Sequence, residues 1–175
     1  MITYQIITNE SEKDLLLPNE PFEIFGQLIV TRSANEWMYE TKLFEKSESL
    51  IFPDENYSFK NINQKGFAIG AYDDDKCVGL AIFEYNWNKT LYLMDLKVKS
   101  NYRKQGIAGE LINAGKVKAK QLHYKGIYTI AQDNNLGACQ FYLKSGFVIG
   151  GLNTMDYRHT TQHNKSDIYF YQDID

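Results

Sequence analysis

The sequence predicts an α/β fold (mixed α+β) in which a central mixed sheet, mostly antiparallel, is flanked by helices. In the first half of the chain, short apolar runs are separated by turn residues, which is typical of strands in a meander. In the second half, strand patterns alternate with segments whose apolar residues recur at helical spacing. This order of elements favours helices layered on a sheet. At 175 residues, the chain is expected to form one domain, residues 1–175.

The elements follow from local patterns. Residues 2–8 indicate a short strand or arm, and Phe22–Arg32 a longer strand with Gly26 as a candidate bulge. Alternation at 37–43 predicts the second strand of a hairpin, whereas residues 45–63 have no clear period and leave a short helix or a mobile loop open. The remaining elements are expected as strands at 67–72, 77–85 and 91–98, a helix at 107–124, a strand at 127–131, a helix at 136–145 and closing strands at 147–150 and 168–171.

Composition narrows the class of protein. The net charge is −3 and the pI about 5.6, so a general nucleic-acid surface is not expected. No apolar run approaches ~20 residues and the start has no basic, apolar leader, which predicts a cytoplasmic protein without membrane association. Cys77 and Cys139 are expected to be free thiols, and no Cys/His cluster has zinc spacing, so no metal is expected.

The loop from Arg103 to Gly109 lies between an apolar strand and a helix. First-turn amides of a helix lack intrahelical partners, and the helix dipole is positive at this end. Gly106 and Gly109 would let a ligand approach these amides, and Arg103 and Lys104 add positive charge. The loop is therefore suited to a pyrophosphate, although a strand-to-helix turn with solvated basic residues fits equally well. The two familiar nucleotide-loop patterns, G-x-x-x-x-G-K-[ST] and G-x-G-x-x-G, are absent.

Arg103-Lys104-Gln105-Gly106-Ile107-Ala108 resembles the R/Q-x-x-G-x-G/A loop of the GNAT superfamily of N-acetyltransferases. Residues 135–147 resemble its second signature, N-x-x-A-x-x-F-Y-x-x-x-G-F, and the resemblance is strongest over 75–150. It implies the GNAT fold, acetyl-CoA as cofactor with coenzyme A as product, and a pantetheine arm paired with the preceding strand. The implied cofactor-binding residues are Leu96, Lys97, Val98, Arg103, Lys104, Gln105, Gly106, Ile107, Ala108, Gly109, Asn135 and Tyr142.

Acetyl transfer to an amine requires a base and an acid, and no covalent enzyme intermediate. Tyr142 occupies the family's position for the acid that protonates the thiolate; the alternative is a packing tyrosine beside Phe141, which is expected in the core. Asp95 interrupts an apolar strand, and burial would raise its pKa, so it is the candidate base or an anchor for the substrate ammonium. A nucleophilic role for Cys139 is disfavoured because no histidine lies nearby in sequence.

Further segments, among them Asn86-Trp87-Asn88, Gln132 to Leu136 and Thr154-Met155, resemble the streptothricin (nourseothricin) acetyltransferases. Those enzymes acetylate an amine on the β-lysine arm of the antibiotic and confer resistance. The resemblance implies a small-molecule amine as partner, in a monomer or homodimer. The expected substrate-binding residues are Asp95, Trp87, Tyr85 and Asp156.

Met94 departs from this group, in which an acidic residue is expected next to Asp95. Two alternatives stay open at this point. One is the same enzyme class acting on a protein N-terminus, a polyamine or another small amine. The other is a non-catalytic acyl-CoA-binding module, against which the presence of Tyr142 and Asp95 speaks.

Overall fold

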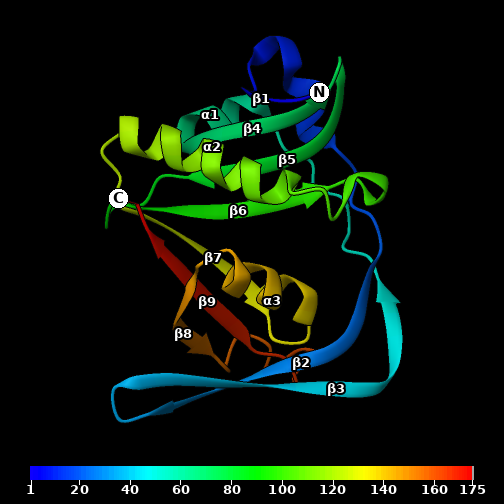
Figure 1. The fold of residues 1–175 in the computed structure, drawn as a ribbon, viewed down its shortest axis with the longest axis vertical. Helices are drawn as coiled ribbons and strands as arrows, with labels where there is room; N and C mark the ends of the chain where they lie inside the picture. The colour runs from blue at the N-terminus through cyan, green and yellow to red at the C-terminus, as the bar shows by residue number, and fades with distance from the viewer. Residues whose placement is uncertain (175) are drawn as a thin grey trace. The chain divides into compact units, whose positions relative to one another are not determined.

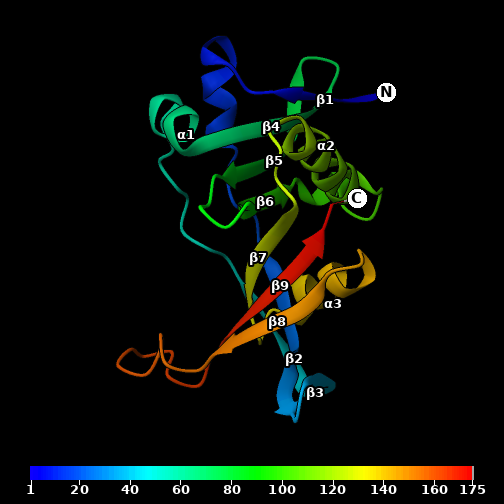
Figure 2. The same cartoon turned by 90° about the vertical axis from the view of Figure 1, so that its left-hand side faces the viewer.

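The computed structural model describes residues 1–174 and confirms a mixed α/β fold (Figures 1 and 2). The chain divides into two compact units, described separately below. The first comprises residues 1–20, 52–127 and the C-terminal end from 173, and the second comprises residues 21–51 and 128–172. Figures 1 and 2 label the helices and strands, which are numbered in the order in which they occur in the chain.

The first unit is built on an antiparallel sheet with the strand order β1-β4-β5-β6. Its helices α1 and α2 lie on opposite faces of strands β4 and β5 (Figures 1 and 2). The elements of this unit are β1 (Ile2–Ile6), the 3-10 helix η1 (Asn9–Leu16), α1 (Phe59–Lys65), β4 (Gly66–Asp73), β5 (Lys76–Glu84), β6 (Thr90–Val98), the 3-10 helix η2 (Ser100–Tyr102) and α2 (Ile107–Gln121).

Strands β4 and β5 are almost fully buried because helices cover both of their faces. On one face, Leu80 and Ile82 join an apolar cluster with Leu15 of η1 and Ile62 of α1. On the other face, α2 approaches β5 so closely that a Cβ at Gly115 would lie 2.2 Å from the Phe83 ring. The sheet carrying β6 is therefore fixed from both sides, which positions the loop that follows it.

The second unit contains a two-stranded ribbon, a helix and three strands with the order β7-β9-β8. Helix α3 packs on strand β2, where a Cβ at Gly26 would meet Leu136. The elements are β2 (Phe22–Ser33), β3 (Glu36–Leu50), β7 (Gly126–Gln132), which begins at the end of the first unit, α3 (Leu136–Lys144), β8 (Val148–Asn153) and β9 (Asp167–Asp173).

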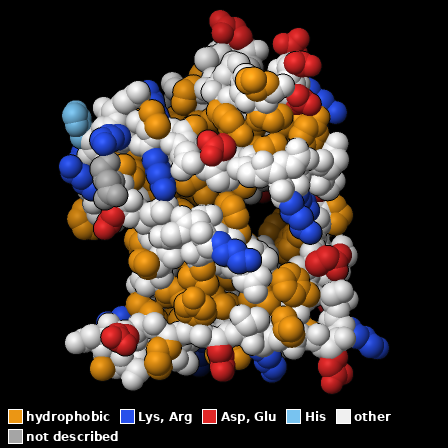
Figure 3. Space-filling model, viewed as in Figure 1, with side chains coloured by type: hydrophobic (Ala, Val, Ile, Leu, Met, Phe, Trp, Pro, Cys, Tyr) orange, Lys and Arg blue, Asp and Glu red, His pale blue; other side chains and the backbone are white. Residues whose placement is uncertain are grey.

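Most expected elements are present, the candidate bulge among them, and two features differ from the expectation. The register of the β2–β3 ribbon shifts between Ile24 and Gly26, which confirms the bulge. Strand β3 continues to Leu50, so residues 45–50 are neither helix nor loop, whereas a short helix does form at 59–65. The 3-10 helix at 9–16 was not expected from the sequence. Figure 3 shows acidic and basic side chains interspersed over one face, in keeping with the small net charge.

Candidate active site

The loop between β6 and α2 has the backbone geometry of an anion site. Gly106 caps the helix in the left-handed region at φ 83°, a conformation that favours glycine. A Cβ built at Gly106 or Gly109 would meet nothing within 4 Å, so the space over both residues is open to a ligand. The Glu110 amide donates to the Gly106 carbonyl at 3.1 Å, which begins the helix and leaves the preceding amides outside its hydrogen-bond ladder.

Within residues 1–174, the amides from Lys104 to Gly109 donate no hydrogen bond to another protein group. The protein's own carbonyls therefore do not occupy these donors in the part of the chain that the structure describes. A row of unoccupied amides at a helix N-terminus fits a phosphate group. The residues present thus fit the diphosphate of acetyl-CoA.

The side chains of the loop have structural partners of their own. Arg103 donates from Nε to the Val98 carbonyl at 3.0 Å, and its Nη2 lies 3.8 Å from the Glu20 carboxylate. That carboxylate also accepts a hydrogen bond from the Ser100 amide. Gln105 donates to the Asn101 carbonyl at 3.1 Å. These contacts fold the loop back on the end of β6, so a phosphate role for the Arg103 side chain stays a prediction.

Strand β6 carries Asp95 into a cluster of charged groups. The Lys97 ammonium lies 3.0 Å from Asp95 Oδ2 and 2.8 Å from Glu55 Oε2, and the Tyr57 hydroxyl donates to Asp95 Oδ2 at 3.2 Å. Asp95 and Lys97 share a face because alternate residues of a strand point the same way. Their side chains are 14% and 11% exposed, so the pair is largely removed from water.

Burial raises the pKa of Asp95, as the sequence predicts, and it does so against the opposing effect of Lys97. Burial alone would lower the pKa of Lys97, but Asp95 and Glu55 outweigh it and hold the pKa above its ordinary value. Burial, followed by the nearby Asp95 carboxylate, also raises the pKa of Tyr57. At neutral pH, Lys97 is therefore a cation shared by two carboxyl groups, and Tyr57 is a neutral donor.

A bulge positions this cluster. Asp95 pairs with Ile82 and Leu93 pairs with Phe83, so Met94 is the extra residue on β6. Its side chain packs against the apolar cluster that includes Leu80 and Ile82. The residue that replaces the expected acid beside Asp95 is thus a packing residue. Beyond the bulge, Leu96, Lys97 and Val98 pair with β5 along one edge, and their role in binding pantetheine stays a prediction.

Tyr142 belongs to an aromatic cluster in the second unit. Its ring centroid lies 5.5 Å from that of Phe147 and 5.6 Å from that of Phe170, and the residue is 8% exposed. Phe141 is only half-buried, so the expectation that Phe141 lies in the core is wrong, whereas Tyr142 packs in the aromatic cluster as its alternative role requires. The reason is the orientation of α3, which turns Tyr142 toward Phe170 of β9. The acid role of Tyr142 stays a prediction.

Two further motif residues have clear local functions. Asn135 caps α3 by accepting a hydrogen bond from the Ala138 amide at 3.3 Å, which confirms the cap; its cofactor contact stays a prediction. Cys139 is buried, its thiol lies 3.5 Å from the Gln132 carbonyl, and burial raises its pKa to about 12. A thiol that is neutral at physiological pH is a poor nucleophile.

The expected substrate-binding residues lie in different parts of the chain. Tyr85 stacks on Tyr124 with centroids 5.8 Å apart, and Trp87 is 91% exposed in the turn before β6. Both belong with Asp95 to the first unit, whereas Asp156 lies exposed in the β8–β9 loop of the second unit. The role of all four in substrate binding stays a prediction.

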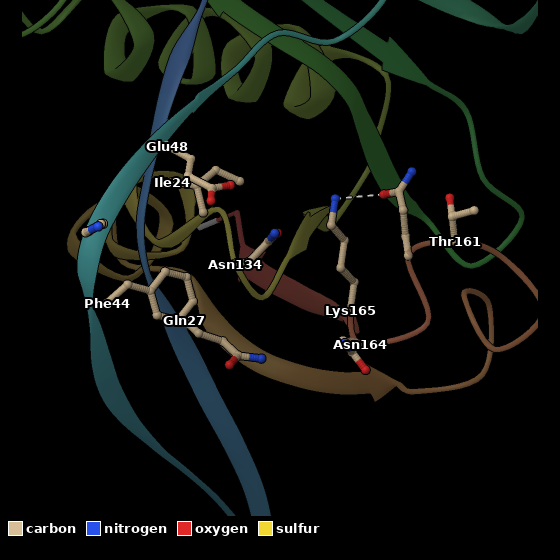
Figure 4. A pocket seen from close by; sticks show the side chains of 10 residues that line it. Ile24, Gln27, Phe44, Glu48, Asn134, Thr161, Asn164 and Lys165 are labelled. Atoms are coloured by element: carbon tan, nitrogen blue, oxygen red, sulfur yellow. Dashed lines mark hydrogen bonds between the residues drawn. The ribbon is translucent and has the colours of Figure 1, made fainter.

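The second unit contains a cleft of about 550 Å³ (Figure 4). Side chains of β2 and β3 line one side, residues of the β8–β9 loop line the other, and Asn134 lies between them. The lining residues are Ile24, Gln27, Phe44, Lys46, Glu48, Asn134, Thr161, Gln162, Asn164 and Lys165. Sequence reasoning did not find this cleft.

Within residues 1–174, no group of three or more His, Cys, Asp or Glu side chains is arranged to hold a metal ion. Over the same residues, no helix has the length and apolar character needed to cross a membrane.

Residues 32–147 match the model of the Acetyltransferase (GNAT) family, which is more than half of the chain. The chain belongs to the GNAT acetyltransferase family. As a GNAT enzyme it is an N-acetyltransferase, and acetyl-CoA is its acyl donor. The non-catalytic acyl-CoA-binding alternative is accordingly set aside.

Two streptothricin acetyltransferases are similar in sequence to this chain, one of them over nearly its whole length. Streptothricin acetyltransferase A of Bacillus subtilis is 31% identical over 166 residues, 94% of this GNAT chain and 96% of that protein. Streptothricin acetyltransferase of Escherichia coli is 32% identical over 103 residues, 58% and 59% of the two chains.

Two crystal structures share the fold of this GNAT enzyme. A Bacillus anthracis protein, provisionally assigned as a streptothricin acetyltransferase and bound to acetyl coenzyme A, has a TM-score of 0.88 at 24% identity and covers 100% of this chain and 99% of its own. Nourseothricin acetyltransferase has a TM-score of 0.82 at 19% identity, with 99% of both chains covered.

Proposed function

We propose that the enzyme transfers the acetyl group of acetyl-CoA to a primary amine of a streptothricin-type antibiotic and thereby confers resistance. The observation that carries this proposal is the 31% identity to Streptothricin acetyltransferase A over nearly the full length of both proteins. Because the match includes residues outside the GNAT signatures, it supports a shared acceptor as well as a shared donor.

In this proposal, the amides of residues 104–109 bind the diphosphate of acetyl-CoA. The open space over Gly106 and Gly109 supports the close approach of the phosphate oxygens to the backbone. The side chains of Arg103 and Gln105 donate hydrogen bonds to preceding backbone carbonyls and so hold the loop in place. The loop therefore loses little conformational freedom when the cofactor binds. From the bound diphosphate, the pantetheine arm would run along Leu96, Lys97 and Val98 and carry the reactive thioester at its end.

Asp95 would accept a proton from the substrate ammonium or hold that ammonium by charge. Its raised pKa favours proton transfer, because a base is most effective when its pKa lies closer to the operating pH. Tyr142 would donate a proton to the departing thiolate. The amine attacks directly, and the buried, neutral thiol of Cys139 supports a reaction without an acyl-enzyme intermediate.

The proposal is tested by measuring thiol release from acetyl-CoA with a panel of acceptors: streptothricin, a simple diamine and a peptide with a free N-terminus. We expect kcat/KM to be highest for streptothricin, and acetylated streptothricin to lose its toxicity for bacteria. A higher kcat/KM for the diamine or the peptide would contradict the assignment of the acceptor while leaving the acetyltransferase class intact.

A further inference from the structure

The cleft of the second unit has an unusual chemical lining. Four of its side chains are carboxamides, namely Gln27, Asn134, Gln162 and Asn164, and Thr161 adds a hydroxyl group. A carboxamide offers both hydrogen-bond donors and an acceptor, as does a hydroxyl group. Ile24 and Phe44 supply an apolar wall, and the Phe44 side chain is 38% exposed.

One lining residue and its neighbour in the sequence each have a buried side-chain oxygen atom without a hydrogen-bond partner among residues 1–174. One is Oδ1 of Asn134, which lies in the lining, and the other is Oδ1 of the neighbouring Asp133. Asp133 is 5% exposed, and its second oxygen accepts a hydrogen bond from Gln27 at 2.7 Å. A buried acceptor without a donor is destabilising, and the Asn134 oxygen, which belongs to a lining residue, is the one that a donor of a bound molecule would satisfy.

The charges of the cleft are nearly balanced. Of the lining residues, Glu48 is acidic and Lys46 and Lys165 are basic. The Lys165 ammonium is held by Oε1 of Gln162 at 2.7 Å and by Oε1 of Gln132 at 3.3 Å (Figure 4). The cleft is therefore not selective for a strongly charged group, and its amides favour a neutral molecule rich in O–H and N–H donors.

We propose that this cleft is a specificity subsite that binds a hydroxylated, sugar-like portion of the acceptor substrate, with Asn134 accepting its hydrogen bonds and Phe44 covering its apolar face. The inference rests on the proposed function, since it assigns a place to a part of the acceptor other than the amine that is acetylated. A simple diamine has no such portion and gains nothing from the cleft.

The test compares KM for streptothricin with KM for 1,3-diaminopropane in the wild-type enzyme and two variants. Asn134→Ala removes the buried acceptor, and Phe44→Ser removes the apolar wall from an exposed strand where folding is least affected. The loss of one buried hydrogen bond is expected to raise the ratio of the two KM values about tenfold. KM for acetyl-CoA serves as an internal reference that a folding defect would also change.

Asn63→Ala is the matched control, because Asn63 lies exposed on α1 in the first unit and its truncation should leave the ratio unchanged. Calorimetry with streptothricin and the CoA-bound enzyme should show the same loss of affinity in both cleft variants. An unchanged ratio, or an equal rise for both acceptors, would overturn the subsite while the proposed function stands. Absence of thiol release with streptothricin in the wild-type enzyme would refute the proposed function and the subsite together.

Discussion

The ammonium of Lys97 lies 3.0 Å from the carboxylate of Asp95, two residues earlier on the same strand. The same ammonium lies 2.8 Å from Glu55, so one cation serves two carboxyl groups. The candidate base is therefore not an isolated acid in an apolar strand. Its pKa results from burial, which raises it, and from Lys97, which lowers it.

Replacing Lys97 with Met should move the acid limb of the pH profile of kcat/KM to higher pH. Asp95 can accept a proton only above its pKa, so activity is lost as the pH falls through that value. Without Lys97, burial acts with less opposition and the pKa rises further. We expect a shift of about 1–2 pH units, the usual effect of an adjacent opposite charge. Lys97→Arg keeps the charge and should leave the limb near its wild-type position; an unshifted limb in Lys97→Met would argue against Asp95 as the base.

Asp95→Asn should separate the two roles left open for this residue. The substitution keeps the shape of the side chain and an oxygen that can accept from Tyr57, but removes the charge. If Asp95 is the base, kcat at neutral pH should fall about 100-fold or more. If it only anchors the substrate ammonium, KM for the acceptor should rise with kcat nearly constant. Glu55→Gln is the control within the same cluster, and a full rate in Asp95→Asn would assign proton removal to water or another residue.

The backbone geometry of the loop before α2 could be predicted from the sequence because its signals are local. Gly106 marks the positive-φ cap of α2, and the apolar spacing that follows marks the helix. The cap at Asn135 could be predicted for the same reason. Each of these features depends on residues within one or two turns, so the pattern and the structure agree.

The partners of Asp95 could be predicted only in part. The proximity of Lys97 to Asp95 follows from the two-residue period of a strand, which places both side chains on the same face. Glu55 and Tyr57 come from the segment between β3 and α1, about 40 residues away in the chain. The periodicity of a sequence indicates local structure only, so it could not predict these contacts.

Two other features could not be predicted for physical reasons. Strand β3 continues to Leu50, but the side chains of residues 45–49 are exposed, so no apolar alternation marks this extension. That Tyr142 is buried and Phe141 only half-buried depends on which side of α3 faces β9, and two adjacent aromatic residues give no indication of that. The first outcome is set by the pairing of β3 with β2, and the second by the packing of α3 against β9.

Tyr142→Phe should lower kcat about 100-fold, because the phenylalanine ring cannot protonate the departing thiolate. The ring itself is retained, so packing against Phe147 and Phe170 is preserved and the affinity for acetyl-CoA should change little. Thiol release under saturating acceptor measures kcat, and calorimetry measures the affinity. Phe141→Leu on the same helix is the control, and an unaffected kcat in Tyr142→Phe would leave Tyr142 as a packing residue.

Gly106→Val should abolish tight binding of acetyl-CoA. The new side chain would occupy the open space over the loop amides and exclude the diphosphate, and losing two or three charge-assisted hydrogen bonds weakens binding by about 100-fold or more. The left-handed backbone at φ 83° adds a cost of about 1–2 kcal/mol to folding. Gly146→Val is a control for the backbone strain, because Gly146 has φ 86° in the second unit, although its new side chain must also displace the Gln172 amide 2.8 Å away. If both variants lose stability but only Gly106→Val loses coenzyme A in calorimetry, the amides bind the phosphates; normal coenzyme A binding by Gly106→Val would exclude the loop as the phosphate site.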